Sequence, residues 1–190
     1  MGKPAWPGML GSMIAELHFI HHTHTDLGYT DLPTTCMDLH VAYIRQAMDA
    51  AEATAHLPEE ARFRWTCEVI APVLELLRRH PEEKPRLLRL IAAGQIEVAA
   101  MPWGMSALMN AEEWRALVAI HAANWRELGV SSAMQCDVNG LSWGVIPDLV
   151  RSGVRHLVMG MNLYAGGRPL PPHSAFSWEG PDGSRLTTWM

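Results

Sequence analysis

The stretch HHTHTDLGYTD, residues 21–31, gathers side chains that bind metal ions. Four of the ten histidines lie in it or just before it: His18, His21, His22 and His24. Alternate residues of an extended backbone point the same way, so His22, His24 and Asp26 share one face. Imidazole nitrogens combined with carboxylate oxygens suit zinc and similar divalent ions. The stretch therefore predicts a metal or catalytic site. The alternatives are core histidines bonded to backbone carbonyls, or a surface tract that binds metal adventitiously.

An apolar run before this stretch, residues 13–20, predicts a buried strand, and strands and helices alternate after it. We expect strands at residues 62–69, 95–101, 133–136 and 156–161, and helices at 36–55, 71–77, 85–93, 111–128 and 145–151. Asn110 followed by Glu113 has the pattern of a helix N-cap with a reciprocating acid. The last segment predicts a hairpin that turns at residues 180–183. Five alternations favour an α/β fold with a parallel sheet or barrel of right-handed crossover units.

The polar candidates fall where predicted strands end. His24 and Asp26 follow the first predicted strand. Of the four later strands, the second ends at Glu68, the third precedes Trp103, the fourth ends at Asp137 and the fifth precedes Asn162. Parallel sheets and barrels keep their active sites at the carboxyl ends of their strands. This placement indicates an enzyme.

Three of these residues have plainer interpretations as well. Asp137 is a candidate metal ligand and catalytic carboxylate, but it also suits a turn before Asn139 and Gly140. Glu68 is either a second carboxylate at the site or a salt-bridged residue at a strand end. Trp103 is either a platform on which a sugar stacks or part of the core.

Composition narrows the class of protein. The 190 residues suffice for one domain or part of a larger one, and we expect residues 1–12 to be flexible. A net charge of −5 without a basic patch argues against nucleic acid, and the apolar runs are too short for a membrane span. Three cysteines without a Cys-x-x-Cys pair argue against a disulfide framework. A reducing, cytoplasmic compartment fits this composition.

Four blocks together resemble the N-terminal catalytic domain of glycoside hydrolase family 38, the α-mannosidases. The blocks are HTHTDLGYTD at 22–31, GQIEVAAMPWGM at 94–105, CDVNGLSWGVIPDLVRSGV at 136–154 and FSWEGPDGS at 176–184. The resemblance covers residues 14–190, and its first and third blocks are the specific ones. Departures at Thr25 and at Val138-Asn139-Gly140 suggest a divergent, bacterial-type branch.

The resemblance implies a seven-stranded (β/α) barrel, one zinc ion and retaining hydrolysis of α-mannosides. It implies that His24, Asp26 and Asp137 bind the zinc and that Asp137 is the nucleophile. His22, Glu68, Trp103 and Asn162 are then candidate contacts for a carbohydrate substrate. The family's last zinc-binding histidine and its general acid lie beyond Met190, so we expect an incomplete catalytic domain with little turnover by itself.

Two other functions remain open. One is a metal-dependent deacetylase or amidohydrolase on a related barrel, in which a metal-bound water attacks an acyl carbon. The other is a fragment that binds metal or carbohydrate without catalysis. Because an incomplete barrel has unpaired strand edges, we also expect possible homo-oligomers through those edges.

Overall fold

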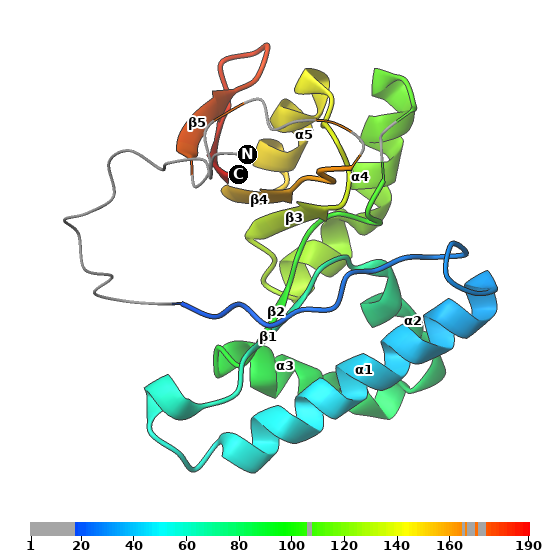
Figure 1. Ribbon diagram of the computed structural model, residues 1–190, viewed down its shortest axis with the longest axis vertical. Coiled ribbons are helices and arrows are strands. Elements are labelled where there is room, and N and C mark those ends of the chain that lie inside the picture. The colour runs from blue at the N-terminus through cyan, green and yellow to red at the C-terminus, as the bar shows by residue number, and fades with distance from the viewer. Residues whose placement is uncertain (1–17, 106–107, 165, 167–169, 171–173) are drawn as a thin grey trace, which may run out of the picture.

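The computed structural model describes residues 18–105, 108–164, 166, 170 and 174–190 (Figure 1). The helices are α1 Pro33–Thr54, α2 Ala71–Arg79, α3 Lys84–Ala92, α4 Ala111–Glu127 and α5 Ile146–Arg151, with single 3-10 turns η1 Glu59–Ala61, η2 Pro81–Glu83 and η3 Trp143–Val145. The strands are β1 Trp65–Cys67, β2 Ile96–Val98, β3 Ser132–Cys136, β4 His156–Gly160, β5 Ala175–Glu179 and β6 Arg185–Trp189. Each helix and strand expected from residue 33 onward is present, although β1 and β2 are shorter than predicted.

The predictions for residues 1–20 are not confirmed in the same way. The segment expected to be flexible, 1–12, lies outside the described residues, as does most of the strand expected at 13–20. Residues 18–20 of that run are not in a strand, and an isolated parallel bridge joins His22 to Thr66 of β1. The stretch at residues 21–31 therefore lies beside β1 at His21 and His22, and its residues 27–31 form a bend.

The start of α4 confirms the predicted cap. The Asn110 side chain accepts hydrogen bonds from the N–H groups of Glu112 and Glu113 at 2.9 and 3.0 Å. The Glu113 carboxylate in turn accepts one from the Asn110 N–H at 2.8 Å. These bonds satisfy backbone donors that have no partner inside a helix, so they fix where α4 begins.

The strands form two sheets. In one, β1 pairs with β2 in parallel; in the other, the order is β3-β4-β6-β5, with β3, β4 and β6 parallel. The strands β5 and β6 are antiparallel, which confirms the predicted hairpin. Next to the ends of β2 and β3, the Ala100 N–H donates a hydrogen bond to the Ser132 carbonyl at 2.8 Å, which links the two sheets.

The expectation of a seven-stranded (β/α) barrel is wrong for this structure. A closed barrel requires every strand to pair on both sides. In the described part of the chain β5 pairs only with β6, and the β1–β2 ladder holds three residue pairs. The turn at residues 180–183 is tight enough to return β6 antiparallel to β5, so the last connection is a hairpin and no crossover. The architecture is two small sheets with helices, one of them mixed. Homo-oligomers through the strand edges remain a prediction.

The helices cover the sheets in two groups (Figure 1). The long helix α1 lies beside α2 and α3, next to β1 and β2, whereas α4 and α5 pack beside the second sheet. Their buried side chains form one continuous core that includes Met48, Leu76, Trp125, Ile146 and Leu157. Among the described helices, none is both long and apolar enough to cross a membrane.

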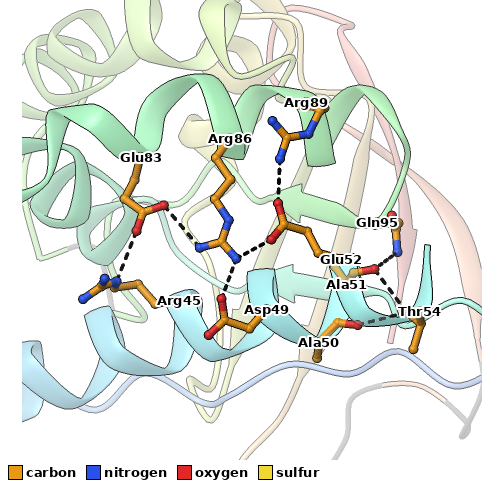
Figure 2. Close-up of polar contacts among 10 residues, drawn as sticks. All are labelled: Arg45, Asp49, Ala50, Ala51, Glu52, Thr54, Glu83, Arg86, Arg89 and Gln95. Carbon is orange, nitrogen blue, oxygen red and sulfur yellow. Dashed lines mark hydrogen bonds and ion pairs between the residues drawn. The ribbon is translucent and has the colours of Figure 1, made fainter. Parts of the chain in front are cut away.

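Charged side chains join α1 to α3 along their exposed sides (Figure 2). The Arg86 guanidinium contacts three carboxylates, those of Asp49, Glu52 and Glu83, the latter two at 2.7 and 3.3 Å. Arg89 also reaches Glu52, at 2.6 Å. We call this group the Arg86 network. It links α1 to α3, and α1 in turn directly follows the stretch at residues 21–31.

Candidate metal centre and cleft

Three of the predicted site residues come together at the carboxyl ends of the strands. The Nε2 atom of His24 lies 3.2 Å from Oδ1 of Asp26 and 3.8 Å from Oδ2 of Asp137. His24 and Asp26 come from the extended chain beside β1, and Asp137 comes directly after β3. The region around His24 and the region around Asp137 thus lie side by side, as their positions after predicted strands indicated.

The backbone presents Asp137 in an uncommon conformation. Its φ is 59°, which makes it the one residue other than glycine with positive φ in the described chain. Its N–H donates to the carbonyl of Gly160 at the end of β4, at 2.6 Å. Asp tolerates this left-handed region better than most residues but still at an energetic cost, and such positions gather at functional sites. The side chain stays 52% exposed.

Glu68 lies behind His24. Its side chain is buried, with a residue exposure of 2%. Its Oε1 lies 3.0 Å from Nδ1 of His24, and its Oε2 accepts a hydrogen bond from the Thr25 N–H at 2.6 Å. Burial raises the pKa of the neighbouring Cys136 thiol to about 12, and the charge of Glu68 and a hydrogen bond to it add to the rise. The thiol is therefore protonated at neutral pH and donates toward Glu68.

An open cleft of about 580 Å³ lies in front of the carboxylates. It is lined by Thr25, Asp26, Leu27, Tyr29, Trp103, Gly104, Met105, Asp137 and Asn162. The backbone of Asn162 is held in place by Asn139. The Asn139 side-chain amide donates to the backbone carbonyl of Asn162 at 2.9 Å and accepts from its backbone N–H at 2.8 Å. Trp103 and Asn162 are thus positioned to meet a ligand that contacts Asp137.

His22 and Glu68 do not line this cleft. Ligand atoms of His22, Glu68 and Cys136 lie within 4.8 Å of one another, and none of these three residues is among those that line the cleft. The candidate substrate contacts of both residues remain predictions.

The electrostatics around His24 favour a positive charge. Burial lowers the pKa of its ring, but the hydrogen bond with Glu68 and the charges of Glu68, Asp26 and Asp137 outweigh that effect and raise it overall. A neutral His24 with Nδ1 bonded to Glu68 directs the lone pair of Nε2 at carboxylate oxygens, an arrangement that repels unless a proton or cation lies between them.

The imidazole and carboxylate donors of His24, Asp26 and Asp137 are of the types that zinc binds. Zinc binds nitrogen and oxygen ligands at about 2.0–2.2 Å, and in a tetrahedral site such ligands are roughly 3.3–3.6 Å apart. The separations of 3.2 and 3.8 Å from His24 Nε2 bracket that range. Each carboxylate is thus at a suitable distance from His24, whereas the group of three possible ligands in the described residues whose ligand atoms all lie within 4.8 Å of one another is His22, Glu68 and Cys136.

Sequence reasoning missed two supports of this centre. The buried His40 of α1 bonds to the backbone of Asp26, although burial, the larger effect, lowers its pKa. The Thr25 N–H is the second partner of Glu68. His40 interrupts the apolar face of α1 between Cys36 and Ile44, a signal that was available in the sequence. The Thr25 contact is made by its backbone N–H, so the identity of the side chain at this position does not predict it.

Known structures share this fold at low sequence identity. A 4-alpha-glucanotransferase from Thermococcus litoralis is 16% identical with a TM-score of 0.59, and the match covers 90% of this chain and 26% of that chain. An alpha-mannosidase from Enterococcus faecalis V583 is 17% identical with a TM-score of 0.64, covering 89% and 19%. A glycosyl hydrolase family 38 protein from Enterococcus faecalis is 16% identical with a TM-score of 0.57, covering 89% and 18%.

The chain thus spans between about a fifth and a quarter of the length of these structures. No curated protein sequence matches it. The description of the family whose model matches is "Glycosyl hydrolases family 38 N-terminal domain", and the match extends over residues 15–190. This match confirms the resemblance carried by the four sequence blocks, and the chain belongs to glycosyl hydrolase family 38.

Proposed function

We propose that this chain carries the nucleophile and part of the zinc site of a retaining glycoside hydrolase that acts on α-mannosides or related α-glycosides. One observation carries the proposal: the exposed Asp137 carboxylate faces an open cleft and lies 3.8 Å from Nε2 of His24. Family membership supports cleavage of a glycosidic bond. One structure of this fold is that of an alpha-mannosidase, which supports the choice of substrate to be tested first.

In the proposed reaction Asp137 attacks the anomeric carbon of the sugar. The carboxylate oxygen forms a bond to that carbon as the bond to the leaving oxygen breaks, and a general acid protonates the leaving oxygen. Water then attacks the same carbon, releases the sugar and returns the Asp137 carboxylate. The configuration at the anomeric carbon is retained because it inverts twice.

The remaining residues bind and orient the sugar. When bound by His24, Asp26 and Asp137, zinc would supply positive charge that holds sugar hydroxyls and steadies the developing charge. The Trp103 ring offers a flat apolar face for the sugar, and Asn162 offers an amide for its hydroxyls. Asn139 fixes the backbone of Asn162 through two hydrogen bonds, and the Asn162 side-chain oxygen accepts a hydrogen bond from the Tyr164 N–H at 2.8 Å, so that amide is oriented before a ligand arrives.

The assignment of Asp137 as the nucleophile is tested by trapping the covalent glycosyl-enzyme intermediate. A fluorinated α-mannosyl fluoride has a leaving group that departs without an acid, so formation of the covalent intermediate depends chiefly on Asp137. We expect mass spectrometry of the digested protein to find one added fluorosugar on the peptide that contains Asp137, and none in Asp137→Asn. The control Asp182→Asn, in the hairpin turn, should be labelled like the natural chain. Labelling of another carboxylate would contradict the assignment.

The same protein distinguishes the other two functions. Release of acetate from an N-acetyl sugar whose glycosidic bond stays intact would point to a metal-dependent deacetylase. Zinc and sugar binding without a covalent adduct would point to a fragment that binds without catalysis. Either result would overturn the proposed nucleophilic role of Asp137 in this chain.

A further inference from the structure

Glu68 has a pattern of contacts that no ordinary strand-end salt bridge needs. It is 2% exposed, and each carboxylate oxygen has a donor: His24 Nδ1 at 3.0 Å and the Thr25 N–H at 2.6 Å. A buried polar group needs hydrogen-bond partners, and a carboxylate oxygen accepts hydrogen bonds from N–H groups. The proton between Glu68 and His24 must then belong to Nδ1.

This arrangement decides what the other ring nitrogen can do. A neutral imidazole carries one N–H and one lone pair, so a proton on Nδ1 leaves the lone pair on Nε2. Nε2 is the atom that faces Asp26 at 3.2 Å and Asp137 at 3.8 Å. We propose that Glu68 is a positioning residue that fixes His24 as the Nδ1–H tautomer and keeps Nε2 free to bind the cation of this centre.

The inference rests on the proposed zinc site but adds a residue to it. Metal-binding histidines commonly donate their second N–H to a carboxylate, which fixes the ring and raises its basicity. Here the carboxylate comes from the end of β1, 44 positions along the chain from His24. Because the cleft is lined by Asp26 and Asp137 without Glu68, Glu68 acts through His24 and does not touch the substrate.

Glu68→Gln separates this role from simple packing. The glutamine side chain has nearly the same shape but one acceptor oxygen and one amide donor. The Thr25 N–H is a fixed donor, so the glutamine oxygen will turn toward it and the NH₂ group will face His24 Nδ1. Nδ1 then has to accept, and the ring proton moves to Nε2, where it blocks the metal.

The experiment measures the tautomer and the metal affinity separately. Nitrogen-15 NMR of His24 in the metal-free full chain, at a pH where the ring is neutral, should show Nδ1–H in the natural chain and Nε2–H in Glu68→Gln. Competition with a chromogenic chelator should show Zn²⁺ affinity falling about 10- to 100-fold in the same variant. The control Asp148→Asn changes another buried carboxylate, paired with Arg151 at 2.5 Å, and should leave both readouts unchanged.

Glu68→Ala provides a second test if the glutamine variant does not fold. It removes both acceptors and imposes neither tautomer, so we expect a mixture of tautomers and an intermediate loss of Zn²⁺ affinity. An unchanged Nδ1–H tautomer in the folded variants, with Zn²⁺ affinity within about twofold of the natural chain, would overturn the proposal. If the natural chain binds no Zn²⁺, the proposed metal site fails, and the NMR result still decides the role of Glu68.

Discussion

The carboxylate of Asp137 lies 3.8 Å from Nε2 of His24, although the two residues belong to distant parts of the sequence. His24 is held from behind by Glu68, and Asp137 is held by its N–H bond to Gly160. Each partner is therefore fixed by a strand end and not by a flexible loop alone. Fixed ligands lose little freedom when they bind an ion or a substrate.

The first prediction concerns the backbone at Asp137. With φ at 59°, a β-branched side chain is strained there, whereas glycine is not and asparagine is tolerated. We expect Asp137→Val to be less stable than Asp137→Gly by about 1–2 kcal/mol, with Asp137→Asn close to the natural chain. Urea unfolding measures these differences. Equal unfolding midpoints for the three variants would mean that the left-handed conformation costs nothing at this position.

The second prediction concerns the stability of the fold at low pH. Hydrogen bonds from Arg78 and then Arg79 lower the pKa of Glu75 in the folded chain to about 2 from an ordinary 4.5. A folded-state pKa below the unfolded value stabilises the fold above pH 4.5, and this contribution is lost as the pH falls toward 2. Glu75→Gln should therefore be less stable than the natural chain at pH 7, by at most about 1 kcal/mol because the pairs are at the surface.

The difference between the two proteins should disappear as the pH falls toward 2, as measured by urea unfolding at a series of pH values. The exposed Glu60 serves as the control position, and Glu60→Gln should show a smaller effect at pH 7. A penalty for Glu75→Gln that stays constant down to pH 2 would show that its origin is not the charge.

The third prediction concerns the Arg86 network. Arg86 contacts three carboxylates between α1 and α3 and its side chain is 21% exposed, so Arg86→Met should lower the free energy of unfolding by roughly 1–2 kcal/mol. The matched control is Arg64→Met, because Arg64 is 51% exposed and its ion pair among the described residues is with the single carboxylate of Glu59. Its effect should stay below about 0.5 kcal/mol.

Salt provides the check on this third prediction. Screening weakens exposed charge pairs, so the difference between Arg86→Met and the natural chain should shrink between about 0.05 M and about 1 M NaCl. A difference that salt does not change would assign the loss to packing of the arginine stem and not to its charge.

Local signals predicted most elements of the fold. Asn110 and Glu113 specify the start of α4 by contacts within one helical turn, and the turn at 180–183 specifies the β5–β6 hairpin by its own sequence. Closure of a sheet is different, because it depends on pairing between strands far apart in the chain. No pattern in β5 shows that its outer edge meets no further strand in the described residues, and the expected barrel failed at this point.

The site was predicted in outline for a similar reason. The rule that active sites lie at the carboxyl ends of strands applies to any parallel strands. It therefore predicted that Asp137, Trp103 and Asn162 lie close together, as they do in the cleft, although the predicted barrel was wrong. It could not distinguish a residue that faces the cleft from one behind it. Glu68 follows β1 directly, but its side chain turns inward to His24 and Thr25, which lie on the chain that pairs with β1 through the bridge between His22 and Thr66.

The fourth prediction tests the central claim, which is that His24, Asp26 and Asp137 form one cation site. The measurement is zinc content by elemental analysis after dialysis of the folded chain against dilute Zn²⁺. We expect about one zinc per chain in the natural protein and in the control His156→Ala, whose histidine lies exposed in β4. His24→Ala and Asp137→Asn should retain none. Equal zinc in all four proteins, or none in the folded natural chain, would contradict the site.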